Sequence, residues 1–153
     1  ASDVYKRQVG HIACVSCMIK KKGGSRMKNV LLIMHRKILA DALTRAMRDD
    51  ERFQLFTEYD YSNALMTCQC AQAHVAVLEI PESGPWTPMR CFSLGDSLKE
   101  RCPGLKLMIL CPESSGTACI ATVQARRQGR IDDFVYYDSS WKYLVSKLEA
   151  LGV

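Results

Sequence analysis

The feature that most constrains the fold is a regular alternation between short apolar runs and longer segments with helical periodicity. The apolar runs have the length of strands and lie at 30–33, 53–57, 75–80, 105–110 and 134–137. Apolar stripes at helical spacing follow these runs and predict helices over 37–50, 64–71, 89–101, 117–128 and 141–151, with Ser62 and Ser140 as N-caps. Five strands that alternate with five helices predict a parallel sheet covered by helices on both faces.

Right-handed crossover connections leave few topologies for such a chain. The expected fold is α/β, a doubly wound five-stranded parallel sheet of flavodoxin-like order 2-1-3-4-5 between two helical layers. The chain has 153 residues, of which 48% are hydrophobic, and this is enough for the core of one domain. No apolar run approaches the roughly 20 residues of a membrane span, so a membrane protein is not expected.

The net charge of +5 comes entirely from the first 26 residues. This segment carries six Lys or Arg residues and one Asp, which leaves 15 basic and 15 acidic residues from Met27 onward. A domain without net charge gives no electrostatic reason to expect direct binding of nucleic acid.

The first 26 residues also lack a sustained period and the apolar core of a secretory signal. MKNVLLI, at 27–33, is typical of a bacterial start, and the Lys-Lys-Gly-Gly before it can be encoded by a ribosome-binding sequence. The opening SDVYKRQ resembles translated adapter sequence. We interpret residues 1–26 as a non-native or disordered extension and 27–153 as one domain. The alternative, a metal knuckle of His11, Cys14 and Cys17, falls short of the four ligands of a structural zinc site.

Six cysteines lie beyond this extension, among apolar positions and without paired CxxC spacing. They are Cys68, Cys70, Cys91, Cys102, Cys111 and Cys119. Cysteine that is not oxidised behaves as a small buried hydrophobe. Since no secretory signal precedes them, we expect core thiols in a reducing compartment and therefore a cytoplasmic location.

In a doubly wound sheet, functional groups gather outside the carboxyl ends of the strands, at the switch point between the first and third strands. The residues at those ends are Met34, His35, Arg36, Glu79, Cys111 and Tyr137. Glu79 ends the apolar run that begins at 75, and burying a carboxylate there is costly unless a neighbouring group binds it. We therefore take Glu79 as the centre of the candidate site.

Four segments resemble the receiver (CheY-like) domains of bacterial response regulators, particularly regulators with a helix-turn-helix output. They are VLLIMHRKILADALTRAMRDDERFQLFTEYDYSNAL, HVAVLEIPESG, ERCPGLKLMILC and IDDFVYYD. The resemblance runs from Met27 to about Leu151 and lies in the order of elements and the apolar pattern. It implies a role in two-component (phosphorelay) signal transduction or transcription regulation.

Receivers of this family accept a phosphoryl group from a histidine kinase on an aspartate after the third strand. The resemblance places this phospho-acceptor position at Glu79. It places the Mg²⁺-binding acidic pair at Met34 and His35, the hydroxyl residue at Cys111, the lysine at Tyr137 and the switch aromatic at Phe134. None of the five chemical positions keeps the residue of the family.

These replacements remove the chemistry that phosphotransfer needs. Mg²⁺ prefers hard oxygen ligands, which Met34 and His35 do not supply. A carboxylate that attacks a phosphoryl group meets like-charge repulsion, which a metal ion and a lysine normally neutralise. We therefore expect a degenerate receiver, or pseudoreceiver, that is not an enzyme and uses no cofactor.

Three roles for Glu79 remain open. It can form a salt bridge with Arg36 or His35 that fills the former pocket. It can imitate a phosphorylated aspartate, although it carries a single negative charge. It can also join His35 and Cys111 as a transition-metal ligand, because imidazole, carboxylate and thiolate suit zinc.

The expected function is protein–protein interaction, with a protein partner or in a homodimer. Family receivers use for dimers the face made by the helix over 117–128, the strand over 134–137 and the last helix. Tyr136, Tyr137, Trp141 and Tyr143 gather in the last two of these elements, and aromatic residues are enriched at interfaces. The alternative for these residues is that several of them simply cover the strand over 134–137. The alternative function is a small-ligand or metal sensor that uses the converted pocket. Trp86, in the loop after the third strand, is interpreted as a lid over this pocket.

Overall fold

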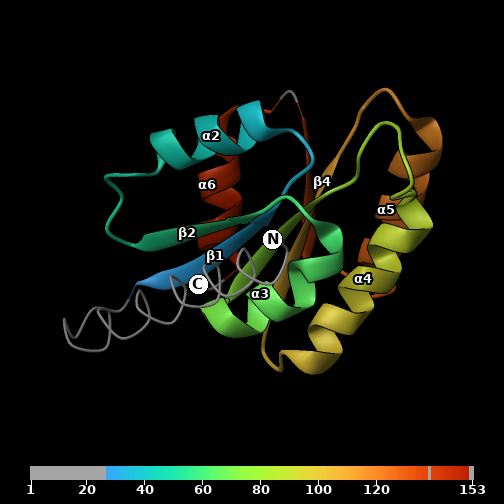
Figure 1. Cartoon of the computed structure of the whole chain (residues 1–153). Coiled ribbons are helices and arrows are strands. Elements are labelled where there is room, and N and C mark those ends of the chain that lie inside the picture. The colour runs from blue at the N-terminus through green and yellow to red at the C-terminus, as the bar shows by residue number, and fades with distance from the viewer. Residues whose placement is uncertain (1–26, 138, 152–153) are drawn as a thin grey trace, which may run out of the picture.

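The structure, a computed structural model, describes residues 27–137 and 139–151, which form a three-layer α/β sandwich (Figure 1). Its strands are β1 (Lys28–Ile33), β2 (Phe53–Glu58), β3 (Val75–Glu79), β4 (Lys106–Cys111) and β5 (Asp133–Tyr136). Its helices are α2 (Lys37–Ala46), the 3-10 turn η1 (Tyr61–Asn63), α3 (Ala64–Ala71), α4 (Pro88–Arg101), α5 (Gly116–Arg127) and α6 (Trp141–Ala150). The predicted fold class and the strand order β2-β1-β3-β4-β5 are confirmed. The interpretation of residues 1–26 concerns residues outside the described part.

The three central strands are buried on both faces, which explains their nearly unbroken apolar runs. Successive side chains of a strand point to opposite faces, so Leu31 and Ile33 of β1 enter one core and Val30 and Leu32 the other. Parallel pairing continues this division across the sheet, since Leu32 lies opposite Val77 of β3. The two cores together hold the sheet between its helical layers.

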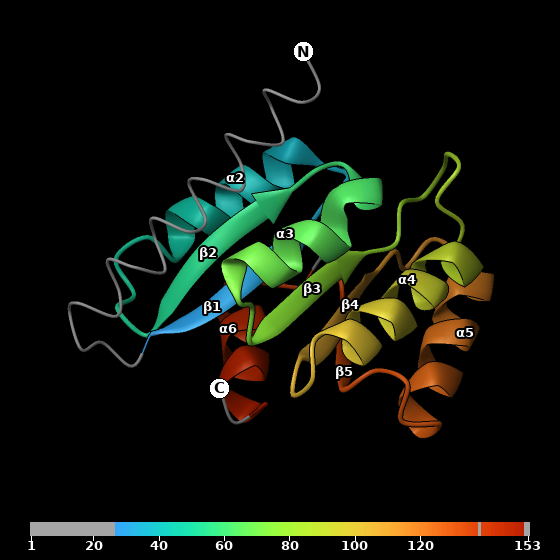
Figure 2. The same cartoon turned by 60° about the horizontal axis from the view of Figure 1, so that its bottom comes forward.

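The helices divide between the two faces of the sheet, as Figures 1 and 2 show. Helices α3, α4 and α5 cover one face, and α2 and α6 cover the other. Alanine and cysteine side chains such as Ala64, Cys68, Cys91 and Ala118 bring the first group close to the strands. None of the helices in residues 27–137 and 139–151 is both long and apolar enough to cross a membrane.

The end of α2 and the cap ahead of α3 differ from the sequence-based prediction, and the other helix ends agree with it to within one residue. Helix α2 ends at Ala46 rather than residue 50, and the Asp50 carboxylate accepts hydrogen bonds from Arg52 in the turn that leads into β2. The predicted N-cap Ser62 is wrong, because the Asp60 carboxylate accepts the Ser62 backbone N–H and begins the 3-10 turn ahead of α3. The predicted cap Ser140 is confirmed, since its hydroxyl accepts the Tyr143 N–H.

Candidate functional site

The parallel strands bring the predicted site residues to one edge of the sheet. Met34 follows β1 and is fully buried, whereas His35 and Arg36 are exposed at the start of α2. Glu79 is the last residue of β3, and Cys111 is the last residue of β4. Strand β5 ends one residue earlier than predicted, so Tyr137 lies directly after it. Phe134 is in β5, half-buried, opposite Ile109 of β4.

The Glu79 carboxylate is fully buried, and hydrogen-bond donors occupy both of its oxygens. Its Oε1 accepts the backbone N–H of His35 at 2.8 Å and that of Arg36 at 3.0 Å. Its Oε2 accepts the Tyr137 hydroxyl at 2.8 Å. A buried carboxylate is tolerated when donors replace its lost water, and three donors do so here. Glu79 therefore joins the loop after β1, the end of β3 and the residue after β5.

The Arg36 side chain is a secondary partner of this carboxylate. Its Nε lies 3.9 Å from Glu79 Oε2, whereas its Nη2 lies 2.9 Å from Glu82 Oε1. The guanidinium also lies over the Tyr137 ring, 4.5 Å from its centroid. The expected salt bridge with Arg36 is thus a long contact, and the closest partners of Glu79 are backbone amides and a phenol. The His35 side chain is exposed.

Tyr137 is held as a donor to Glu79. Burial, and then the nearby Glu79 carboxylate, raise the pKa of its hydroxyl far above the ordinary value, so the hydroxyl keeps its proton. The same hydroxyl contacts the backbone carbonyl oxygen of Ile80. At the position where the resemblance puts a lysine, the chain therefore has a neutral hydrogen-bond donor.

Sequence reasoning missed Tyr61. Its ring is buried, and its hydroxyl donates to the Glu79 carbonyl oxygen at 2.6 Å. Burial, and then the Glu79 carboxylate, raise the pKa of this hydroxyl too. No sequence motif indicates that a tyrosine at the start of η1 makes this contact. The backbone and the side chain of Glu79 are thus each held by a tyrosine.

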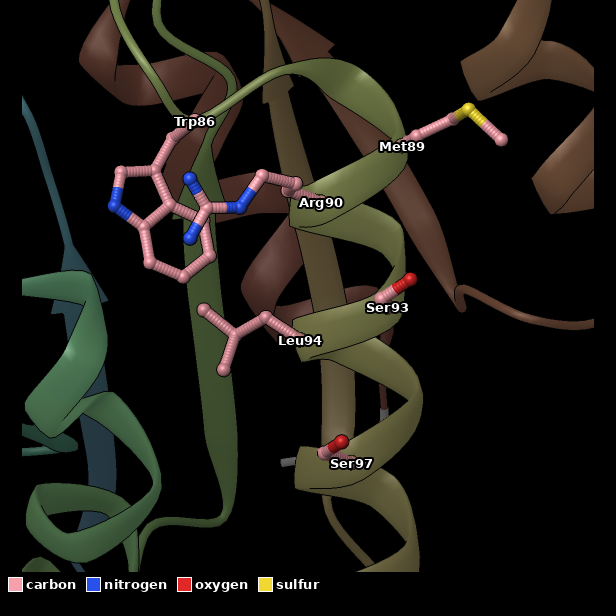
Figure 3. Close-up of a pocket in the computed structure, with 6 residues that line it drawn as sticks. All are labelled: Trp86, Met89, Arg90, Ser93, Leu94 and Ser97. Carbon is pink, nitrogen blue, oxygen red and sulfur yellow. The ribbon is translucent and has the colours of Figure 1, made fainter.

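Trp86 covers Tyr61 rather than the carboxylate itself. The two ring centroids are 5.2 Å apart, and the Arg90 guanidinium lies 4.2 Å from the centroid of the Trp86 ring (Figure 3). A hollow of about 340 Å³ on α4 is lined by Trp86, Met89, Arg90, Ser93, Leu94 and Ser97. In Figure 3 the Met89 side chain points away from the Trp86–Arg90 pair, and it is 82% exposed. Trp86 therefore meets the site through the Tyr61 ring, whose hydroxyl donates to the Glu79 carbonyl oxygen.

The Cys111 thiol faces α5. Its Sγ lies 3.8 Å from Cys119 Sγ and 3.6 Å from the Thr122 hydroxyl oxygen. Burial raises the pKa of the Cys111 thiol to about 11, against a smaller opposite effect of Thr122, so it is protonated at neutral pH. A protonated thiol in contact with a second thiol is a poor substitute for the hydroxyl that the resemblance expects here.

The candidate metal ligands His35, Glu79 and Cys111 do not form a cluster in the described part of the chain. Among residues 27–137 and 139–151, no group of three or more His, Cys, Asp or Glu side chains is gathered as a metal ion requires. The structure therefore does not bring His35, Glu79 and Cys111 together as ligands. Two other carboxylates, Asp132 and Asp133, lie at the start of β5, at the opposite end of the strands. There Asp132 binds Lys99 at 2.7 Å and Asp133 binds Lys147 at 3.0 Å.

Comparisons with known proteins identify the fold. No protein-family model matches the chain, and no curated protein matches it significantly. Among solved structures, a DNA-binding response regulator of the LuxR family from Staphylococcus aureus is 13% identical, with a TM-score of 0.66 over 83% of this chain and 100% of that one. A CheY-like response regulator receiver domain protein from Methanospirillum hungatei is 15% identical, with a TM-score of 0.64 over 82% and 94%. Adenylate cyclase from Rhodopirellula baltica is 16% identical, with a TM-score of 0.65 over 82% and 87%.

These likenesses show that the chain has the receiver (CheY-like) fold. At identities of 13% to 16%, these likenesses show how the elements are arranged and do not show the chemistry of the site. The structural neighbours include both a DNA-binding regulator and a cyclase, so the fold alone does not determine the function of this chain.

Proposed function

We propose that the chain acts in bacterial two-component signalling or transcriptional regulation as a pseudoreceiver, a receiver-like domain that docks a protein partner without phosphorylation of its pocket. The observation that supports this most is the Glu79 carboxylate, whose two oxygens accept the N–H groups of His35 and Arg36 and the Tyr137 hydroxyl. An attacking oxygen must have an available lone pair and must approach phosphorus in line. Here three donors hold the two carboxylate oxygens in place, so an in-line attack by Glu79 would have to break at least one of these hydrogen bonds.

The same contacts argue against an imitation of the phosphorylated state. A phosphoryl group carries about two negative charges and three acceptor oxygens at neutral pH. Glu79 brings one charge, and donors on the β1–α2 loop and after β5 already satisfy it. Its proposed role is to hold these two segments in one arrangement, so that the surface above them is preformed.

The surface proposed for docking is the β5 face, which we define by Ile120 and Val123 of α5, Phe134 and Tyr136 of β5, and Tyr143 of α6. Strand β5 is the edge strand of the sheet, and Phe134 and Tyr136 pack edge to face with centroids 5.7 Å apart. Ile120 is 64% exposed and Tyr143 is 48% exposed. Exposed aliphatic and aromatic side chains beside an open strand edge favour a protein partner.

A second copy of the chain is the partner that can be tested first. Sedimentation of the purified full chain over a range of concentrations should show a dimer. Ile120→Glu should raise its Kd by about tenfold or more, because a charge then lies in an apolar contact. Ile38→Glu is the matched control, since Ile38 is 88% exposed but lies on α2, away from this face. Equal effects of the two substitutions would contradict docking through the β5 face.

The cysteines fit the proposed location. None of the cysteines in the described part of the chain is joined in a disulfide. This agrees with a reducing compartment, and we propose the cytoplasm.

One observation favours a small-ligand sensor as a second candidate. A hollow of about 630 Å³ beside the site is lined by Arg36, Lys37, Ile38, Leu39, Ala42 and Tyr137. Its volume is typical of small-molecule sites, and its apolar wall with two cations suits an apolar ligand with an acidic group. Thermal titration with nucleotides, and with zinc for the metal version, tests it. A rise in melting temperature of several degrees that Tyr137→Ala abolishes would favour the sensor.

A further inference from the structure

The thiols of Cys111 and Cys119 form a close pair at the end of β4. Their sulfur atoms are 3.8 Å apart, and a disulfide needs about 2.0 Å, so the sulfurs must approach by roughly 1.8 Å. Cys111 is fully buried, whereas Cys119 is partly exposed in the first turns of α5. The pair thus combines one buried cysteine with one that is partly exposed.

The chain between the two cysteines has room to move. Residues 113, 114, 116 and 117 are exposed, and a side chain added at Gly116 would meet no atom within 4 Å. The segment is the loop from β4 into the N-terminus of α5, where the Ser115 hydroxyl caps the helix. Pro112 and Ala118, next to the two cysteines, are buried, so we expect the exposed residues between them to absorb a shift of this size.

A second thiol pair differs in this respect. Cys68 and Cys102 have their sulfurs 3.5 Å apart, but Cys68 is buried within α3 and Cys102 caps the end of α4. Closing that pair requires two packed helices to approach each other. Among the described cysteines, Cys111 and Cys119 are therefore the pair whose sulfurs are close, of which one residue is partly exposed, and which a surface loop connects.

We propose that Cys111 and Cys119 are a redox-sensitive pair that a peroxide converts into a disulfide, which fixes the first turns of α5 against the end of β4. The Cys119 thiolate attacks one peroxide oxygen, so its sulfur is oxidised to sulfenic acid and the other oxygen leaves as hydroxide, or as water once protonated. The Cys111 sulfur then attacks the sulfenic sulfur, loses its proton, and the sulfenic oxygen leaves as water. Each disulfide consumes one peroxide molecule and two thiols. A cellular dithiol reductant reverses the step.

The bond would act on the β5 face. Cys111 lies directly opposite Tyr136 in the parallel register, and Cys119 immediately precedes the exposed Ile120. Moving Cys119 toward β4 therefore moves Ile120 relative to Tyr136, and both residues belong to that face. This consequence rests on the proposed docking function, whereas the formation of the disulfide does not.

Trypsin mapping of the full chain gives a direct test. Cleavage after Lys106 and Arg126 places both cysteines in one peptide, residues 107–126, without any other cysteine. After treatment of the reduced protein with hydrogen peroxide, we expect this peptide to lose two hydrogen atoms and to resist alkylation until a reductant is added. Cys119→Ser should abolish the change in mass. Cys102→Ser, which breaks the other close pair, should leave it intact.

Three outcomes would overturn the proposal. In the first, both cysteines of this peptide remain alkylatable while other cysteines oxidise. In the second, Cys119 proceeds to sulfinic acid. In the third, Cys111 or Cys119 joins another cysteine, including Cys14 or Cys17.

The effect of the disulfide on the β5 face is measured separately, as a change in the Kd of the dimer. Sedimentation of the oxidised and reduced chains should show dimer Kd values that differ by about fivefold or more, and Cys119→Ser should remove the difference. Equal Kd values with the disulfide present would overturn the coupling between the thiol pair and the face. A chain that is monomeric in both states would contradict docking of a second copy through the β5 face and leave the disulfide, established by the peptide mass, standing.

Discussion

Replacing Glu79 by alanine removes the acceptor that joins three segments at the carboxyl edge of the sheet. Two backbone N–H groups lose their acceptor, and the Tyr137 hydroxyl loses one of its two acceptors. A buried donor without an acceptor costs about 1–3 kcal/mol. Water can reach the amides of the exposed residues His35 and Arg36, so we take about 1 kcal/mol for each of the three donors. The free energy of unfolding of Glu79→Ala should therefore fall by about 3 kcal/mol.

Glu79→Gln separates the shape of this side chain from its charge. The amide oxygen can still accept from His35 and Arg36, and the Tyr137 hydroxyl can still donate to the Ile80 carbonyl oxygen. Because hydrogen bonds to a charged acceptor are stronger than those to a neutral one, we expect a loss of about 1 kcal/mol. The order of stability should be parent, then Glu79→Gln, then Glu79→Ala.

Urea unfolding followed by circular dichroism measures these free energies, with the slope of the transition as a check on two-state behaviour. Glu82→Ala is the control, because Glu82 is the exposed partner of Arg36, and exposed ion pairs contribute about 0–1 kcal/mol. A loss below 1 kcal/mol for Glu79→Ala would refute the reasoning. So would a loss for Glu82→Ala as large as that for Glu79→Ala.

Three further predictions concern Tyr137, Asp132 and the first 26 residues. Tyr137→Phe removes one donor to Glu79 and should lower the free energy of unfolding by about 1 kcal/mol in urea, and an unchanged value would show that this contact is dispensable. Burial opposes a charge on Asp132, but Lys99 and the Leu107 N–H outweigh it and lower the pKa of this carboxyl in the folded state. The contribution of Asp132 to the free energy of unfolding is therefore present above the unfolded pKa of about 3.9 and is lost as pH falls through the lower native value. Asp132→Asn should therefore flatten the decline of the urea midpoint on acidification, and an equally steep decline in the variant would contradict this. A fragment that begins at Met27 should melt at the same temperature as the full chain by calorimetry, whereas a drop of several degrees would mean that residues 1–26 contribute to the fold.

The order of elements was predictable because burial on both faces leaves a visible mark in the sequence. Strand β3 reads as VAVLE, and its last residue could be placed at the functional edge from the topology alone. Helix starts were less certain where two cap residues compete. Asp60 precedes Ser62 by two residues. Its carboxylate accepts the Ser62 backbone N–H, so Asp60 and not Ser62 is the cap at this point of the chain.

The partners of Glu79 were less accessible to sequence reasoning than its position. Charge complementarity pointed to the side chains of Arg36 and His35, but their backbone amides are the closer donors, and every residue other than proline has one. The contact of Tyr61 with the Glu79 carbonyl oxygen depends on how η1 packs, which has no sequence pattern. The approach of Cys111 and Cys119 likewise depends on where α5 begins relative to the end of β4.

The most direct test of the central claim is phosphorylation with acetyl phosphate and Mg²⁺, followed by intact mass and by the stability of any adduct in acid and base. A receiver domain with its acidic pair, aspartate and lysine in place serves as the positive control. We expect no phosphoprotein from the parent chain or from Glu79→Asp, because the shorter carboxylate restores neither metal ligands at Met34 and His35 nor a lysine at Tyr137. An acid-stable, base-labile phosphoryl group on the parent chain would contradict the pseudoreceiver account. The same group on Glu79→Asp alone would show that the pocket still holds a metal ion through groups other than those described.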